Sequence, residues 1–347
     1  MTARLRPPGG TWARAILVVA AVGLALVAGL VAWAEHQMNP AGAPGPPVDV
    51  DIPMGTSTHG IANLLASRGV ISNSTLFLVY LKLKGGGPFQ AGVYSLHRPE
   101  TYSAVVHDLS ASQGYRLTVP EGFTAAQIAD RVGHIRGHDA GNFLAVATGK
   151  VACPGLRSPY EPAGGDLEGL LFPDTYRINP DESDCEIART MVDHFDVVAR
   201  TIGLDRAPAT VGLTPYQAVI VASMVEREAK LASDRSLVAE VIYNRLKRGM
   251  RLQVDATVLY AVGASRPGGP TAAELGVDSP YNTYRVAGLP PTPIASPGKA
   301  ALEAALAPAQ GDFLYYVVVQ ADGKEAFSPT LAGQDANIRL AQQRGLR

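Results

Sequence analysis

The chain has 347 residues, enough for two or three domains, and 47% of them are apolar. Its formal net charge at pH 7 is −1, from 30 basic and 31 acidic side chains, and the basic residues form no stripe. This balance gives no electrostatic support for a nucleic-acid partner, so we expect none.

The first predicted element is an apolar helix over residues 15–34, AILVVAAVGLALVAGLVAWA. It carries no charge and has the length that a bilayer-spanning helix requires. Arg4, Arg6 and Arg14 precede it and Glu35 follows it. The positive-inside rule therefore predicts that everything after the helix lies outside the cytoplasm.

A cleaved signal peptide is the alternative, because Ala-Trp-Ala at residues 32–34 has the form of a cleavage site. The apolar run is longer than signal sequences usually have, so we expect a retained single-pass anchor. Residues 1–14 are then a cytoplasmic N-terminus. The Pro- and Gly-rich residues 35–47 are predicted to form a tether.

Folded sequence begins near Val48 with a predicted strand, turn and amphipathic helix in VDVDIPMGTSTHGIANLLASRG. The same order recurs in LTVPEGFTAAQIADRV, where Thr124 and Gln127 have the spacing of a capping box. The matching residues have identical offsets: Pro53, Gly55, Ile61 and Ala62 in the first segment, and Pro120, Gly122, Ile128 and Ala129 in the second. We therefore predict one strand–turn–helix unit used twice, with a domain boundary near residues 112–114.

Two segments follow this boundary. A middle segment, residues 115–209, contains LEGLLFPDTYRI. The remainder, residues 210–347, opens with LTPYQAVIVASMVEREAK, in which Thr214 is the predicted N-cap of a helix and Pro215 its first residue. Ser233 is the predicted cap of the next helix. The C-terminal FLYYVVVQADGKEAF is predicted to form a hairpin.

Cys153 and Cys185 are the cysteines of the chain. Outside the cytoplasm an oxidising environment permits a disulfide between them, and two unpaired thiols are the alternative. No neighbouring base marks either one as a catalytic nucleophile.

Glu226 and Glu228 lie at the end of the apolar run VASMVEREAK. Residues two apart on a helix point about 200° apart, so these carboxylates cannot share a site. Glu228 continues the bulkier apolar stripe, where a half-buried carboxyl loses hydration and its pKa rises toward neutrality. Such a group can donate a proton to a leaving oxygen, as cleavage of a glycosidic bond requires. The alternative from this stretch alone is a pair of solvated glutamates bound to nearby basic residues.

No other motif offers competing chemistry. The sequence has no HExxH, no CxxC pair, no P-loop and no GxSxG elbow. His134 and His138 have metal-ligand spacing, but Gly137 weakens a helix there and no third ligand is evident. We therefore expect a structural or solvated pair, and no metal or other cofactor.

The chain resembles the endolytic murein transglycosylases, the MltG or YceG-like family. The resemblance rests on ASMVEREAKLASDRSLVAEVIYNRLKRGMRLQVDATVLYAVG, SPYNTYRVAGLPPTPIASPGKAALEAALAPA, EGLLFPDTY and VPEGFT. It implies an α+β architecture: one transmembrane helix, a LysM-like module over residues 48–113 and a catalytic domain over residues 114–347. It also implies localisation to the cell inner membrane, with the catalytic domain in the periplasm.

The implied reaction is cleavage between N-acetylmuramic acid and N-acetylglucosamine in nascent glycan strands. No water is added, a 1,6-anhydro-muramyl end is left, and strand elongation is terminated. The implied partners are peptidoglycan strands and, at the membrane, peptidoglycan synthases. The family's catalytic glutamate falls on Glu228, the residue that the helical pattern also selects, and Glu226 remains a secondary possibility.

The resemblance further implies a cleft lining whose amides and phenols suit sugar hydroxyls and acetamido groups. The implied substrate-binding residues are Gln253, Asp255, Tyr281, Asn282 and Tyr284. An N-cap role for Asp255 and core packing for the two tyrosines are the alternatives.

Two other functions remain open. One is a hydrolase that pairs Glu228 with Asp255 or Asp174, because hydrolysing glycosidases need a second carboxylate. The other is a non-catalytic, membrane-anchored scaffold that binds peptidoglycan.

Overall fold

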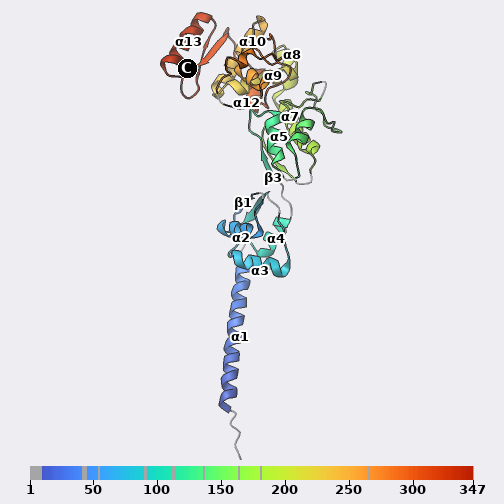
Figure 1. Ribbon diagram of the computed structural model, residues 1–347, viewed down its shortest axis with the longest axis vertical. Helices are drawn as coiled ribbons and strands as arrows, with labels where there is room; N and C mark the ends of the chain where they lie inside the picture. Colours follow the sequence, from blue (N-terminus) through green and yellow to red (C-terminus); the bar gives the residue numbers. More distant parts are fainter. Residues whose placement is uncertain are drawn as a thin grey trace, which may run out of the picture. The chain divides into compact units, whose positions relative to one another are not determined.

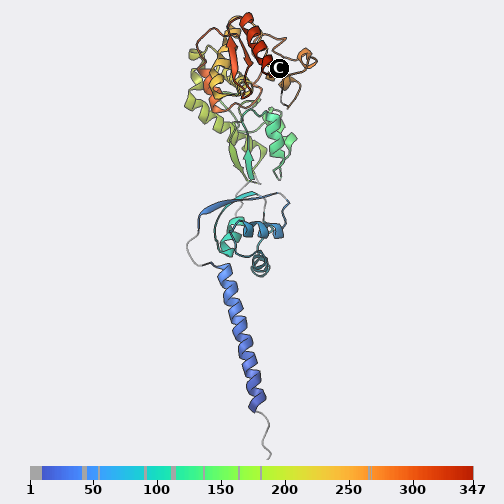
Figure 2. The same cartoon turned by 90° about the vertical axis from the view of Figure 1, so that its left-hand side faces the viewer.

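The structure is a computed structural model that divides into two compact units, Met1–Arg116 and Leu117–Arg347 (Figures 1 and 2). It describes residues 10–40, 45–53, 55–89, 92–110, 115–135, 137–162, 165–179, 182–264, 266 and 268–346. The predicted boundary at residues 112–114 lies outside these ranges, as do Arg4 and Arg6. Helix and sheet are mixed in both units, as predicted.

The N-terminal helix α1 (Gly10–Met38) extends beyond the predicted span at both ends (Figure 1). Its segment Ala15–Met38 is apolar and unburied, with a mean hydropathy of 2.8, which fits a single-pass anchor or a signal sequence. Residues 35–38 continue the helix instead of forming part of the predicted tether, and two of them contact the rest of the first unit. The Ser72 hydroxyl donates to the Gln37 carbonyl at 2.7 Å, and Met38 packs against the core of the unit.

The rest of the first unit packs short helices against an antiparallel pair of strands. Val50 lies opposite Tyr94 in this pair, and both are fully buried. The elements are β1 (Pro47–Ile52), α2 (Thr58–Ser67), α3 (Ser74–Lys84), β2 (Gly92–His97) and α4 (Tyr102–Ser110).

The predicted repeat is confirmed. In both segments a strand leads through a glycine turn into a helix, β1 to α2 and β3 to α5. Gly55 and Gly122 have the same φ of 77°, which only glycine adopts without strain, and Ile61 and Ile128 are buried at the same place in their helices. The Thr124–Gln127 capping box forms as predicted.

The second unit holds most of the helices. Its strands form two separate pairs, β3 with β4 and, antiparallel, β5 with β6. The elements are β3 (Tyr115–Thr118), α5 (Ala125–Gly133), α6 (Ala140–Ala147), β4 (Thr175–Ile178), α7 (Asp184–Ile202), α8 (Ala207–Thr210), α9 (Pro215–Glu228), α10 (Arg235–Lys247), α11 (Asp255–Ala261), α12 (Lys299–Leu306), β5 (Tyr315–Val318), β6 (Glu325–Ser328) and α13 (Leu331–Gln343), with short 3-10 turns η1 (Leu204–Arg206), η2 (Ala232–Asp234) and η3 (Glu274–Gly276).

Helix α9 is the centre of this unit. Every residue from Ala218 to Val225 is at most 3% exposed, so the helix is covered on all sides. The predicted N-cap is confirmed: Thr214 and Gln217 form a capping box, and Pro215 is the first helical residue. The helix ends at Glu228, where the backbone of Ala229 turns extended.

The predicted cap of α10 is wrong. Asp234 occupies the N-cap position without a side-chain capping bond, and Ser233 lies in the 3-10 turn η2 before it. The Ser233 hydroxyl donates to the Asp234 carboxylate at 3.0 Å instead of capping the helix. The hairpin prediction is confirmed, because β5 and β6 pair antiparallel and α13 packs on them.

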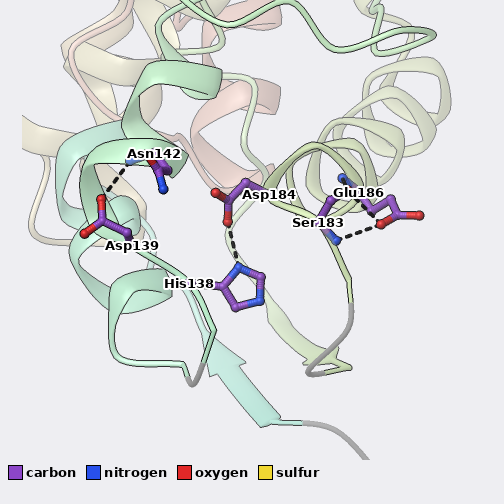
Figure 3. Close-up of polar contacts among 6 residues, drawn as sticks. All are labelled: His138, Asp139, Asn142, Ser183, Asp184 and Glu186. Carbon is purple, nitrogen blue, oxygen red and sulfur yellow. Dashed lines mark hydrogen bonds and ion pairs between the residues drawn. The ribbon is translucent and has the colours of Figure 1, made fainter.

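Cys153 and Cys185 form a disulfide, with their Cα atoms 5.6 Å apart. The bond fixes the loop after α6 to the start of α7, where Figure 3 shows further polar contacts. The His138 ring nitrogen Nδ1 lies 2.7 Å from the Asp184 carboxylate (Figure 3). The predicted structural role of this histidine is thus supported. Among the described residues no cluster of three or more His, Cys, Asp or Glu side chains is arranged to hold a metal ion.

Candidate active site

Glu228 lies at the C-terminal end of α9, where its side chain is partly exposed. One carboxylate oxygen accepts the backbone N–H of Ala256 at 3.3 Å, from the first turn of α11. The other accepts the Tyr316 hydroxyl at 2.9 Å, from β5. Two separate elements, α11 and β5, therefore hold the carboxyl group at the end of α9 in a fixed orientation.

The surroundings of Glu228 make it easier to protonate than an ordinary glutamate. Burial raises its pKa above the ordinary value, and the nearby charge of Asp255 acts in the same direction. The hydrogen bonds from Tyr316 and Ala256 stabilise the carboxylate and oppose this shift only in part. Burial also raises the pKa of Tyr316, so that the phenol remains a donor. A raised pKa makes the carboxyl easier to protonate and its carboxylate a stronger base, which suits a group that both gives and accepts a proton.

Arg245 on α10 fixes the strand that carries Tyr316. It is 8% exposed, and its guanidinium donates to the carbonyls of Leu314 at 2.7 Å and Leu252 at 2.6 Å. The ring of Tyr315 lies against the same guanidinium, 5.3 Å from centroid to Cζ. This cation joins the start of the hairpin to the loop that precedes α11.

Asp255 and Tyr284 belong to the surroundings of Glu228. The Tyr284 hydroxyl donates to the Asp255 carboxylate at 2.5 Å, the Asp255 charge raises the pKa of Glu228, and Glu228 helps to raise the pKa of Tyr284, which burial raises most. The alternative that Asp255 caps a helix is wrong, because it is the first residue of α11 and Val254 occupies the cap position. Gln253 is exposed, with a φ of 51° that turns the chain into α11.

Tyr281 and Asn282 have partners other than Glu228. Asn282 is fully buried, and its amide donates to the carbonyls of Leu275 and Val277 at 3.0 and 2.8 Å. This side chain holds its own loop together and has no exposed surface for a sugar. Tyr281 packs on the ring of Tyr260, with centroids 4.9 Å apart. Of the five predicted binding residues, the structure thus brings Asp255 and Tyr284 toward Glu228, whereas the side chain of Gln253 accepts a hydrogen bond from Arg245 at 3.4 Å.

Glu226 has a separate environment, as the helical geometry predicts. Its carboxylate accepts the backbone N–H of Gly298 at 3.1 Å and lies 3.8 Å from the Arg235 guanidinium. These contacts fasten the loop before α12 to the end of α9. A structural role explains them fully.

Several sequence signatures converge here. The Arg227 guanidinium donates to the Gly122 carbonyl at 3.2 Å, and Gly122 in turn donates its N–H to the Ser296 carbonyl at 2.9 Å. VPEGFT, VEREAK and PIASPG therefore meet at the end of α9. Glu168, from EGLLFPDTY, accepts the Ala125 N–H at 3.1 Å and the Tyr260 hydroxyl at 3.1 Å.

A cavity of about 720 Å³ lies within the second unit beside these contacts. Its walls include Phe123, Glu168, Arg227, Ala256 and Tyr260. Glu228 is not one of the cavity's lining residues, but its neighbour Arg227 and its hydrogen-bond partner Ala256 both are. Burial raises the pKa of Glu168 to about 8. Aromatic faces beside carboxyl groups suit a sugar, whose rings stack and whose hydroxyls hydrogen-bond.

Sequence reasoning missed Tyr316, Glu168 and Glu325. Glu325 is 6% exposed and lies on β6 with a raised pKa of about 8, caused first by burial and then by the charge of Glu228. One signal in the sequence could have identified Glu325. It is a charged residue within a segment predicted to form an apolar hairpin. Nothing comparable marks Tyr316, which is one of two adjacent tyrosines.

Comparison with known proteins gives consistent matches. The YceG-like family matches residues 50–340. The endolytic murein transglycosylase of Bacillus subtilis strain 168 is 35% identical over 298 residues, which is 82% of either chain. The protein of that name from Streptococcus pneumoniae strain D39 is 30% identical over 322 residues, 84% of this chain and 58% of its own length. A crystal structure of a putative YceG-like protein from Listeria monocytogenes is 31% identical with a TM-score of 0.64, covering 84% of this chain and 98% of its own.

Proposed function

The chain belongs to the YceG-like family of endolytic murein transglycosylases, and we propose that Glu228 is the single acid and base of its reaction. The enzyme is a peptidoglycan lyase, and it cuts within glycan strands. The observation that carries the assignment of Glu228 is its anchoring: a carboxyl with a raised pKa, held between Tyr316 and the Ala256 N–H at the end of a buried helix.

In the first step, protonated Glu228 gives its proton to the oxygen that links N-acetylmuramic acid to N-acetylglucosamine. The bond between that oxygen and the anomeric carbon breaks, and the N-acetylglucosamine side leaves as an alcohol. The muramyl acetamido oxygen stabilises the positive charge on the anomeric carbon. Glu228 is now a carboxylate that accepts hydrogen bonds from Tyr316 and Ala256.

In the second step, the 6-hydroxyl of the same muramyl ring attacks its anomeric carbon, and Glu228 takes the hydroxyl proton. The product is a 1,6-anhydro ring, and Glu228 regains the proton that it gave. An intramolecular nucleophile benefits from high effective molarity and needs no water held by the protein. One carboxyl is therefore sufficient.

Substrate binding follows from the neighbours of Glu228. Asp255 and Tyr284 offer hydrogen-bonding groups near Glu228, the exposed Gln253 lies two residues before Asp255, and the half-open cavity lined by Ala256 offers room for a sugar. Its volume of about 720 Å³ is within the range of small-molecule sites. We assign it to sugar units of the strand next to the cleaved bond.

We place the second unit on the outer side of the membrane, which in a cell with two membranes is the periplasmic side of the inner membrane. Helix α1 has the length and apolarity of an anchor, and a disulfide such as Cys153–Cys185 is typical of proteins outside the cytoplasm. In this arrangement the first unit is a LysM-like wall-binding module. An enzyme anchored in this way would terminate the elongation of nascent glycan strands beside the peptidoglycan synthases.

The alternatives have weaker support. A hydrolase needs a second carboxylate to activate water, yet Asp255 is engaged by Tyr284, and Asp174 lies 3.4 Å from His194. A non-catalytic scaffold would not require the Glu228 carboxyl to be held by two hydrogen-bond donors and to have a raised pKa.

The test is digestion of purified sacculi by the detergent-solubilised full chain, with mass analysis of the sugar ends. We expect 1,6-anhydro ends from the wild type and a loss of roughly 10²–10⁴-fold in their rate of formation with Glu228→Gln. A hydrolase would give reducing ends that are one water heavier. Undiminished anhydro ends from a Glu228→Gln protein with unchanged thermal unfolding would refute the proposal.

A further inference from the structure

The last turn of α1 is attached to the first unit beside the start of α3. The Ser72 hydroxyl donates to the Gln37 carbonyl, and Met38 packs against the core of the unit. Ser72 lies just before Asn73, the N-cap of α3, so this contact brings α3 next to the end of α1. In both views α3 runs across the direction of α1 (Figures 1 and 2). In a membrane crossed by α1, α3 would therefore lie along the surface.

Two tryptophans mark the part of α1 that fits the bilayer. Trp12 is 79% exposed and Trp33 is 50% exposed. At the rise of an α-helix they are about 32 Å apart along the axis, close to the hydrocarbon thickness of about 30 Å. Tryptophan is enriched at both boundaries of this layer. Met38 lies about 8 Å beyond Trp33, which places it, and the start of α3 beside it, at the level of the lipid headgroups.

The face of α3 that points away from the core is apolar and exposed. Phe77 and Leu81 are buried in the core of the first unit, whereas Val79 is 48% exposed and Leu83 is 76% exposed. Val79 and Leu83 are four residues apart and share one helix face, roughly opposite Phe77 and Leu81. The other elements of the unit lie on the far side of α3 from α1 (Figures 1 and 2). The exposed apolar face is therefore directed toward the membrane side.

Two cations accompany this face. Lys82 and Lys84 lie in the last turn of α3, on either side of Leu83, and both are exposed. Helices that lie in a membrane interface place apolar side chains at the boundary between headgroups and acyl chains, and lysines beside the headgroups. Anionic phospholipids attract such cations. The composition of α3 thus matches its position at the end of the anchor.

We propose that α3 is an interfacial helix that rests on the anionic phospholipid bilayer crossed by α1. Val79 and Leu83 contact the acyl chains, and Lys82 and Lys84 bind lipid phosphates. The inference rests on the proposed retention of α1 as an anchor. With α1 and α3 both fixed in the bilayer, the first unit has one orientation on the membrane, so the anchor orients this unit as well as attaching it.

The test is electron paramagnetic resonance of the full chain in vesicles of phosphatidylglycerol and phosphatidylethanolamine that contain no other protein. Both native cysteines are in the disulfide, so Leu83→Cys supplies one free thiol for a nitroxide label. We expect this label about 5–10 Å deep in the interface, with high access to oxygen and low access to a water-soluble nickel chelate. Asp51→Cys, at an exposed position of β1, is the control and should give a label in water.

A Leu83 label as accessible to the nickel chelate as the Asp51 label, in a chain that stays in the vesicles, would overturn the inference. The face would then be free for a protein partner. Adding Val79→Glu should move the Leu83 label toward water, and an unchanged depth would also contradict the proposal. In vesicles of phosphatidylcholine alone the label should lie closer to water, and equal depths would refute the role of the two lysines.

Failure of the proposed anchoring gives a different result. If α1 is a signal peptide, protein isolated from cells will lack residues 1–34 by intact mass and will not insert into vesicles. That outcome would overturn both the anchoring and the interfacial helix. A retained α1 with Leu83 in water overturns the interfacial helix alone.

Discussion

Tyr316 and Glu228 lie 88 residues apart in the chain and are joined by a hydrogen bond of 2.9 Å from the phenol to the carboxylate. The bond links the C-terminal hairpin to the end of the central helix. A phenol that stays protonated is a constant donor, so it supports Glu228 most strongly when the carboxylate is charged. The orientation of the Glu228 carboxyl therefore depends on β5, a strand near the C-terminal end of the chain.

Tyr316→Phe should lower kcat about 10–100-fold with little change in KM, because a hydrogen bond to a charged group is worth roughly 1.5–3 kcal/mol. The same contact also determines in which direction the pH dependence of activity should shift. The hydroxyl lowers the pKa of Glu228, so removing it should move the alkaline limb of activity to higher pH. Steady-state rates on an uncrosslinked glycan strand measure both effects. The ring still packs on Phe327, so unfolding should be nearly unchanged, and an unaltered kcat would contradict the assignment.

Glu226→Gln should behave differently from Glu228→Gln although it is two residues away. We expect the rate to change by less than about fivefold, below 1 kcal/mol. Stability should fall by roughly 1–2 kcal/mol, because the contacts to Gly298 and Arg235 are weakened. Parallel measurements of rate and denaturant unfolding separate these effects. A rate loss as large as that of Glu228→Gln would mean that the helical geometry selected the wrong glutamate.

Glu168 should make stability depend on pH. Its pKa is about 8 in the folded protein against an ordinary 4.5, so the folded state holds a proton that the unfolded state releases. The contribution is fully present below pH 4.5 and is lost as the pH rises through about 8. Glu168→Gln should flatten the fall in unfolding free energy between pH 5.5 and 7.5 by about 1.4 kcal/mol per pH unit. Denaturant titrations at several pH values test this, and a slope equal to that of wild type would show that Glu168 is ionised in the fold.

The disulfide should contribute strongly to the second unit. Cys153 and Cys185 are 32 residues apart, and closing a loop of that length stabilises a fold by about 3–4 kcal/mol. The double variant Cys153→Ser/Cys185→Ser should lose this amount in unfolding experiments. Reductant should destabilise the wild type equally and leave the double variant unaffected. Equal stability of oxidised and reduced wild type would contradict the prediction.

Local features of the fold could be read from the sequence. Thr214 and Pro215 start α9 as predicted, and the position of Glu228 at the end of an apolar stripe is itself a local property. The repeated turn at Gly55 and Gly122 was predictable for the same reason, since the unusual φ is required by residues adjacent in the chain.

Contacts between distant segments could not be predicted in this way. The hairpin of Tyr316 was predicted, but no local pattern says which of its faces meets α9. Asn282 looked suitable for sugar binding because of its amide, yet its hydrogen bonds go to Leu275 and Val277 in an irregular loop without periodicity. Ser233 failed as a cap because η2 already places the chain in a tight turn there.

Arg245 has a consequence for how the enzyme responds to acidity. Its guanidinium keeps its charge at every pH at which proteins remain folded, and its partners Leu314 and Leu252 contribute carbonyls that do not titrate. The Arg245 part of the frame around the reacting acid therefore stays the same while the acid itself gains and loses its proton. A change in pH should therefore alter the fraction of enzyme molecules in which Glu228 is protonated, and leave the geometry of the Arg245 contacts unchanged.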